Sequence, residues 1–401
     1  MTYRVKVSER GSGAPSSPIR KLVPLADGAK SKGRHVYHLN IGQPDIPTPE
    51  PMLHAAQEYK GPVLSYGPSG GLPEFINALA GYYESCAISL RKNQILATTA
   101  ASEALLFALA AVTDPGDQVL IPDPLYANYL GFAAILGVTV TPAVCSPEDG
   151  YKIPPPEILD KLCGPRCKAM LLCNPGNPTG RVTSSDELRA IGDWAKARNI
   201  FLIGDECYRE FCYEGSAPPS VLNLEGCEDL TIMTDSISKR FSACGARVGC
   251  LVSRNEEVMA TVMKFAQARL CPPTLGQLMG IKAFTETPPS YYQKIIDTYR
   301  ERRDLLCEKL SEMPGVSYRK PEGAFYIMAT LPVSDSEDFT RWMLTDFHLN
   351  NKTVMVAPGA GFYATKGLGA KEVRIAYVLE LVHLETAMKV LAAGLRAFSD
   401  R

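Results

Sequence analysis

The sequence has little that points to a membrane or to secretion. No apolar run in its 401 residues reaches the about 18 residues that a membrane-spanning helix needs. Residues 1–21 are basic and rich in serine, but they contain no apolar segment of the kind that secretory signals carry. We therefore expect a cytoplasmic protein that does not bind a membrane.

Net charge and paired cysteines are also scarce. The chain carries 42 Lys and Arg residues against 43 Asp and Glu residues, and its formal net charge of −1 gives no reason to expect a nucleic acid partner. The twelve cysteines are scattered without a Cys-x-x-Cys motif, and the closest pair, Cys163 and Cys167, has no second pair nearby. Structural zinc needs such a cluster, so we expect no metal.

The composition, by contrast, is typical of a globular protein. Hydrophobic residues make up 46% of the chain and charged residues 21%, which argues against a disordered protein. A length of 401 residues suggests roughly two or three structural units. Residues 1–35 are polar and basic, which is typical of an arm lying over another surface or of a disordered tail.

The middle of the chain alternates between strand-like and helix-like segments. Apolar runs of strand length occur at 94–100, 118–122, 168–174, 199–205 and 230–236. Amphipathic or apolar helical patterns occur at 72–85, 102–112 and 184–199. This alternation predicts an α/β fold with a mostly parallel sheet that helices cover on both faces.

The pattern changes in the last third of the chain. Residues 290–313 form a long, charged helical pattern, and short strands with turns follow before a closing helix at 384–398. We interpret this part as a smaller α+β domain. The predicted organisation is an N-terminal arm with part of the small domain (1–48), a large domain (49–285), and a bridging helix with the small C-terminal domain (286–401).

Polar residues stand at the ends of three predicted strands, where open α/β sheets bind their ligands. Asn177 lies in the irregular loop NPGNPTG, Asp205 ends the next strand three residues before Tyr208, and Lys239 lies in a Ser-rich turn. Taken singly, such an acid is usually a helix cap and such a lysine a solvated charge. Together, Asp205 can hold a cationic ring nitrogen, Tyr208 and Asn177 can bind a ring oxygen, and Lys239 can act as an amine nucleophile.

A phosphate site is predicted beside these groups. The apolar helix at 100–112 begins with small residues and a hydroxyl, Ala101 and Ser102 among them, and a helix start attracts phosphate. Ser236 and Arg247 add a hydroxyl and a guanidinium. Pyridoxal phosphate combines a phosphate, a basic ring nitrogen, a ring oxygen and a carbonyl that a lysine can attack.

With these motifs in this order, the sequence resembles the class I pyridoxal-phosphate aminotransferases of fold type I, close to the aspartate aminotransferase group. The resemblance runs from about residue 36 to the C-terminus. It also rests on LNIGQPDIPTP (39–49), YGPSGGLPEFINALA (66–80), PLYANY (124–129) and VRIAY (373–377). It implies ping-pong transfer of an amino group between an L-amino acid and a 2-oxo acid, with aspartate and 2-oxoglutarate as one such pair.

The resemblance also implies roles for residues in these motifs. Gly42 would line the substrate site, Tyr126 would stack on the cofactor ring, and Arg374 would bind the substrate α-carboxylate, with Asn177 beside it. Tyr66 would reach the cofactor phosphate of the partner subunit in a homodimer with its active sites at the interface. Lys239, Asp205 and Tyr208 would be the catalytic residues.

Two departures from the family pattern concern the phosphate-binding helix. The family usually has two glycines where this sequence has Ala100 and Ala101. Because alanine can present its backbone amide in a right-handed helical or extended conformation, we expect phosphate binding to survive. Ser102 stands where one aspartate-using subgroup has a lysine, which weakens the case for aspartate; Arg269 is a candidate replacement.

Other interpretations have weaker support. A β-eliminating lyase could use the same scaffold, because loops rather than the fold select the reaction. A ligand sensor without activity would need a DNA-binding region, and no basic helix is present. Ser236 and Lys239 also form the Ser-x-x-Lys of acyl-serine hydrolases, but the Lys-Thr-Gly of that class is missing.

Overall fold

The computed structural model describes residues 5–215 and 217–399. Within this part of the chain, seven strands form one sheet in the order β2-β8-β7-β6-β5-β3-β4. They are β2 (Ile95–Thr98), β3 (Gln118–Asp123), β4 (Thr139–Val144), β5 (Cys167–Cys173), β6 (Phe201–Asp205), β7 (Thr231–Ser236) and β8 (Gly249–Ser253). The ladder from β4 to β7 is parallel, and β8 is antiparallel to both of its neighbours. The predicted mostly parallel sheet is confirmed.

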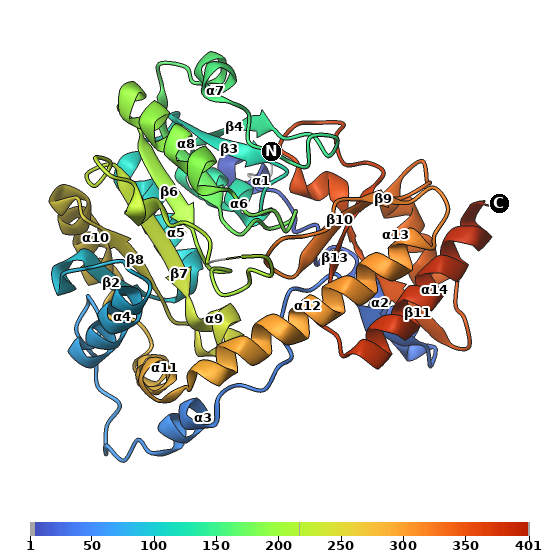
Figure 1. Cartoon of the computed structure of the whole chain (residues 1–401), viewed down its shortest axis with the longest axis horizontal. Helices are drawn as coiled ribbons and strands as arrows, with labels where there is room; N and C mark the ends of the chain where they lie inside the picture. Colours follow the sequence, from blue (N-terminus) through green and yellow to red (C-terminus); the bar gives the residue numbers. More distant parts are fainter. Residues whose placement is uncertain (1–4, 216, 400–401) are drawn as a thin grey trace.

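Helices cover both faces of this sheet (Figure 1). Along β5, Leu171 joins the apolar cluster on one face, and Met170 and Leu172 join the cluster on the other. One face packs against α4 (Pro73–Ser85), α7 (Pro156–Leu162), α8 (Ser185–Arg198) and α11 (Thr274–Glu286), and the other against α5 (Ala100–Val112), α6 (Asn128–Leu136) and α10 (Glu256–Arg269). Burial on both faces explains why the strands are apolar throughout instead of alternating with polar residues.

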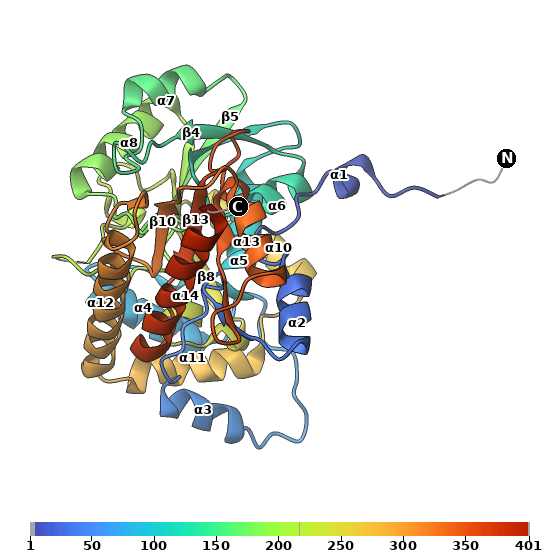
Figure 2. The same ribbon diagram turned by 90° about the vertical axis from the view of Figure 1, so that its right-hand side faces the viewer.

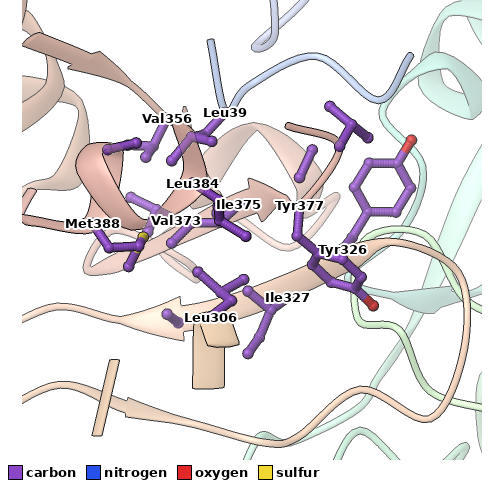
Figure 3. Packing of buried hydrophobic residues seen from close by; sticks show 14 of the residues in the cluster. Leu39, Leu306, Tyr326, Ile327, Val356, Val373, Ile375, Tyr377, Leu384 and Met388 are labelled. Atoms are coloured by element: carbon purple, nitrogen blue, oxygen red, sulfur yellow. The ribbon is translucent and has the colours of Figure 1, made fainter. Parts of the chain in front are cut away.

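A second, smaller sheet lies beside the first, and the long helix α12 (Pro289–Ser311) runs from one to the other (Figure 1). This sheet has the order β12-β13-β10-β9, all antiparallel. Its strands are β9 (Ser317–Tyr318), β10 (Tyr326–Thr330), β12 (Ala357–Pro358) and β13 (Glu372–Ala376). With α13 (Ser336–Thr345) and α14 (Leu381–Ser399), it has an apolar core in which Ile327, Ile375 and Leu384 pack, and Tyr326 and Tyr377 stand at one side of the residues drawn in Figure 3.

The N-terminal region is more ordered than its composition suggests. It forms α1 (Glu9–Ser12), which extends outward in Figure 2, and α2 (Val23–Ser31), and α3 (Glu50–Gln57) follows. The prediction of a disordered tail is wrong for α2, because Leu22 and Ala26 are fully buried with Met355 of β11 (Lys352–Met355). Strand β1 (His35–His38) then pairs in parallel with β11. The exposed charged residues of α2, Asp27 and Lys30, make this segment polar in composition, so the composition did not indicate its buried apolar face.

Candidate active site

A cavity of about 720 Å³ lies at the carboxyl ends of the parallel strands, next to the smaller sheet. The predicted site residues that line it are Gly42, Ala101, Ser102, Tyr126, Asn177, Asp205, Tyr208, Ser236, Lys239, Arg247 and Arg374. Residues at the ends of β6 and β7 and in the loops after β3 and β5 meet there, because parallel strands end at the same edge of the sheet. Tyr66 is the predicted residue that does not line the cavity; it is 80% exposed.

Lys239 lies three residues after the end of β7, in the short helix α9 (Ile237–Arg240). Ser236 caps this helix by accepting a hydrogen bond from the Ser238 amide at 3.1 Å. The Lys239 ammonium donates to the carbonyl oxygen of Gly42 at 2.7 Å, so the lysine bridges two distant segments of the chain. Gly42 has to be glycine here, because a Cβ atom would lie 1.8 Å from the hydroxyl of Tyr326.

Asp205 is a buried carboxylate without a cationic partner. Its side chain ends β6, is 4% exposed, and accepts hydrogen bonds from the Tyr129 hydroxyl at 2.8 Å and the Cys207 amide at 3.3 Å. Among the described residues, no Lys, Arg or His nitrogen lies within 4.0 Å of it. Burial raises the pKa of Asp205, and the two hydrogen bonds counteract only part of that shift. A cation brought to this carboxylate would therefore bind favourably.

Arg374 is the converse case, a buried cation without an anionic partner. It lies on β13, is 1% exposed, and donates to the side-chain oxygen of Asn177 at 2.9 Å and to the carbonyl of Asn40 at 2.7 Å. The rings of Tyr326 and Phe362 lie 4.3 and 4.7 Å from its guanidinium carbon. Within the described structure its Nε has no hydrogen-bond partner, and burial lowers its pKa. Among the described residues, no carboxylate pairs with this guanidinium, whose planar fork suits a carboxylate.

Two hydrogen-bonded pairs hold the aromatic rings of the cavity. The hydroxyls of Tyr208 and Tyr326 lie 2.9 Å apart, and the amide of Asn128 donates to the Tyr126 hydroxyl at 2.7 Å. Burial raises the pKa of Tyr208 well above its usual value, so its hydroxyl stays protonated and can donate. Tyr208 therefore lines the cavity, and its hydrogen-bond partner there is another tyrosine, Tyr326.

The residues predicted to form a phosphate site lie together in the cavity, and one expectation about their backbone needs correction. Within the described structure the Thr99 side chain does not cap α5, and Glu103 accepts a hydrogen bond from the Thr99 amide at 2.8 Å. Amides of the first helical turn remain free, and Ser102, Ser236 and Arg247 line the cavity beside them. The expected right-handed or extended backbone is wrong for Ala100, whose φ is +60°. The chain turns sharply into the helix there, which is why a glycine suits this position.

Arg269 is not among the residues that line the cavity. It lies 3.2 Å from a carboxylate oxygen of Glu103 and donates to the backbone carbonyl of Ser69 at 3.0 Å. The structure therefore gives no support to Arg269 as the replacement for the family's lysine.

Sequence analysis missed several residues that shape the cavity: Arg20, Asn40, Tyr129 and Tyr326. Tyr129 falls within PLYANY, so its helical position next to Tyr126 was the one available signal. Asn40 and Tyr326 contact Arg374 and Tyr208 across 334 and 118 residues of sequence, and Arg20 lines the cavity from the N-terminal region. Single-sequence patterns carry no information on such contacts.

Comparison with known proteins agrees with this geometry. Residues 34–391 match the family model described as "Aminotransferase class I and II". The chain belongs to this family. Its similarity to the aspartate aminotransferase group, inferred from the motifs, is confirmed by full-length relatives. Transaminase activity and the fold of these enzymes follow from this membership.

The names of similar aminotransferases differ in substrate. The aspartate aminotransferase of Thermotoga maritima is 32% identical over 89% of this chain and 92% of its own length. Aromatic-amino-acid aminotransferase 2 of Thermococcus litoralis is 30% identical over 95% of this chain and 96% of its own. The structure of an alanine aminotransferase from Pyrococcus furiosus has a TM-score of 0.89 and 30% identity, covering 98% of this chain and 100% of that one. Similarity alone thus leaves the amino acid open.

The family uses pyridoxal phosphate, and the unpaired groups of the cavity suit this cofactor. Asp205 lacks a cation that a protonated ring nitrogen would supply, and the free amides of α5 lack an anion. Within the described residues, no group of three His, Cys, Asp or Glu side chains could hold a metal ion. None of the helices described there has the length and apolar character needed to cross a bilayer.

Proposed function

We propose that this chain is a pyridoxal-phosphate-dependent transaminase that moves an amino group between an L-amino acid and a 2-oxo acid by a ping-pong mechanism, with aspartate and 2-oxoglutarate as the pair. The observation that carries the proposal is that Asp205 and Arg374, one buried anion and one buried cation, line the same cavity, and neither has a counter-ion among residues 5–215 and 217–399. An unpaired buried charge is costly, so each marks a place for a ligand of opposite charge.

In this proposal, different side chains of the cavity bind the cofactor, bind the substrate and transfer the proton. When bound, pyridoxal phosphate supplies a carbonyl that takes up the amino group and a ring that accepts electrons from the substrate α-carbon. Asp205 would keep the proton on the ring nitrogen, and the side chains of Tyr208 and Asn177 would donate hydrogen bonds to the ring oxygen. Arg374 holds the substrate α-carboxylate with its guanidinium fork. Lys239 would take the proton from the substrate α-carbon as a general base and later give a proton back as a general acid.

A second subunit is part of the proposal. Val63, Leu64 and Tyr66 are 68%, 54% and 80% exposed in an irregular segment before α4. Three large apolar side chains are thus exposed within four consecutive positions. Such a surface is typical of one that a second copy of the chain covers. We place Tyr66 at the phosphate of the partner's active site. Light scattering of the wild type and of a Tyr66→Phe variant, with cofactor affinity measured in parallel, tests this placement.

The test of the proposed function is the isolated half-reaction. Holoenzyme mixed with L-aspartate, without an oxo acid, should release one 2-oxo acid per active site and stop, with a change of the visible absorbance band. Adding 2-oxoglutarate should restore the band and yield glutamate. Steady release of ammonia from an amino acid without an acceptor, as a β-eliminating lyase would give with cysteine, would contradict the proposal. So would the lack of any band with added cofactor.

A further inference from the structure

The cavity carries one more positive charge than the proposed function uses. Four basic side chains line it, Arg20, Lys239, Arg247 and Arg374, against the single carboxylate of Asp205. In the proposed function Lys239 attaches the cofactor, Arg247 faces its phosphate and Arg374 binds the α-carboxylate. Arg20 has no assigned partner.

Arg20 also lacks a partner within the protein. Among residues 5–215 and 217–399, no carboxylate lies within 4.0 Å of its guanidinium. Its neighbour Lys21 differs, since it forms an ion pair with Glu337 outside the cavity. Of these two adjacent basic residues, Lys21 is paired outside the cavity, and Arg20, which lines the cavity, has no carboxylate partner among the described residues.

The backbone that presents Arg20 is fixed by packing and hydrogen bonds. The Arg20 amide donates to the carbonyl of Ser17 at 3.2 Å, and the turn is closed by a second bond to the same carbonyl at 3.0 Å. Pro18 is buried against Gly361, where a Cβ atom would lie 2.1 Å from the proline ring. Leu22 is fully buried on the other side. Arg20 is exposed between these two anchors, so its side chain is free to meet a ligand while its backbone is not free to move.

One chain of hydrogen bonds ties this turn to the α-carboxylate site. The side-chain amide of Asn40 donates to the carbonyl of Ile19 at 2.8 Å, and the carbonyl of Asn40 accepts from Arg374 at 2.7 Å. Arg20 directly follows Ile19 in sequence. These hydrogen bonds therefore fix the backbone of Arg20 relative to the guanidinium of Arg374. Two guanidinium groups that line one cavity suit a ligand with two carboxylates.

We infer that Arg20 binds the distal carboxylate of a dicarboxylic amino acid or oxo acid, the task for which Ser102 provides no positive charge. This inference rests on the proposed function and names its substrate class. Arg20 is then a specificity-determining residue: it adds binding only for substrates with a second carboxylate, and monocarboxylic substrates leave it in solvent.

The test compares Arg20→Ala with Lys21→Ala, which removes the same charge from the same turn but outside the cavity. In the holoenzyme, Arg20→Ala should lower kcat/KM for aspartate by about tenfold to a hundredfold, the effect of one lost charged hydrogen-bond pair. Its kcat/KM for alanine should stay within about twofold, a change within the noise of a surface substitution. Lys21→Ala should match the wild type with both amino acids, and Arg20→Lys should fall between Arg20→Ala and the wild type.

A binding measurement gives a readout independent of turnover. The aspartate aminotransferase structure from Thermus thermophilus was determined with maleate, a dicarboxylate that serves as the probe here. Calorimetry should show maleate bound about tenfold or more weakly by Arg20→Ala holoenzyme than by Lys21→Ala. Equal losses for aspartate and alanine, a loss of cofactor affinity instead, or unchanged maleate binding would each overturn the inference. A wild type inactive with every amino acid would instead reject the proposed function.

Discussion

In the part of the cavity formed by the large sheet, each predicted residue lies at the end of a strand or within a few positions of one, whereas the part facing the smaller sheet draws its residues from segments scattered over the chain. We call the first set the cofactor half (Ser102, Asp205, Tyr208, Ser236 and Arg247) and the second the substrate half (Arg20, Asn40, Gly42, Tyr326 and Arg374). Repeated strand ends make the cofactor half regular. The substrate half lacks this regularity because its segments meet through individual contacts between side chains and backbone.

The two halves meet at Lys239, so its replacement should have the largest effect. Its backbone belongs to the cofactor half at the end of β7, and its ammonium donates to Gly42 of the substrate half at 2.7 Å. Lys239→Ala removes both the covalent attachment and the proton carrier, and should lower turnover by about 10⁴-fold. Steady-state assays should show this, and mass spectrometry after borohydride reduction should find no cofactor on the protein. Turnover near that of the wild type would remove Lys239 from the mechanism.

Asp205→Asn tests the cofactor half and should change activity and stability in opposite directions. Activity should fall on the order of a thousandfold, because a neutral amide cannot keep the proton on a ring nitrogen. The cofactor-free variant should unfold at a higher temperature than the cofactor-free wild type near neutral pH, because it no longer buries an unpaired charge.

The pH dependence of this stability gain has a defined sign. Burial raises the pKa of Asp205 in the folded protein above its unfolded value, so the folded state binds the proton more tightly. The wild type therefore loses stability as the pH rises from the unfolded pKa through the folded one. The advantage of Asp205→Asn should grow over this window and stay constant above it. Calorimetric melting from acidic to neutral pH checks this; an advantage that shrinks with rising pH would contradict it.

Arg374→Lys tests the substrate half. A lysine keeps the charge but loses the fork that binds a carboxylate in two places, and it leaves the Asn177 oxygen and the Asn40 carbonyl without their donor. We expect kcat/KM to fall by about tenfold to a hundredfold for aspartate and alanine alike. This uniform loss separates Arg374 from Arg20, whose loss should be confined to dicarboxylates. If kcat/KM fell for aspartate but not for alanine, Arg374 would bind the distal carboxylate instead of the α-carboxylate, which would contradict its assigned role.

The smallest expected effect concerns backbone strain at the phosphate site. Ala100 adopts φ +60°, a conformation that costs an L-residue about 1–2 kcal/mol relative to glycine. Ala100→Gly should therefore raise the free energy of unfolding slightly, by about 1 kcal/mol at most after the greater flexibility of unfolded glycine is subtracted. Urea denaturation of the cofactor-free protein measures this. Ala101→Gly is the control, since Ala101 has no positive φ and should lose stability within the helix.

The difference between the cofactor half and the substrate half also explains which parts of the fold and of the site could be predicted from the sequence. The strands around Asn177, Asp205 and Lys239 and the helix α5 could be predicted because buried parallel strands leave continuous apolar runs and their ends share one edge. The positive φ of Ala100 could not, since alanine gives no signal of it. Neither could Tyr326, whose contact with Tyr208 spans 118 residues of sequence.

The N-terminal turn shows the same limit. Its polar composition is typical of a loose arm, yet Leu22 is fully buried and Ile19 is bonded to Asn40. Arg20 owes its place in the cavity to these two contacts. A basic residue in a polar segment carries no local sign that it faces a binding site, so its position becomes visible only once the fold is known.

The affinity of the cofactor-free protein for pyridoxal phosphate, compared by calorimetry between Asp205→Asn and Arg374→Lys, tests the division into two halves most directly. We expect Asp205→Asn to weaken binding by about tenfold to a hundredfold, the effect of one lost charge-assisted hydrogen bond, and Arg374→Lys to keep the wild-type dissociation constant. A comparable loss of cofactor affinity in Arg374→Lys, or none in Asp205→Asn, would show that the cavity is not divided in this way.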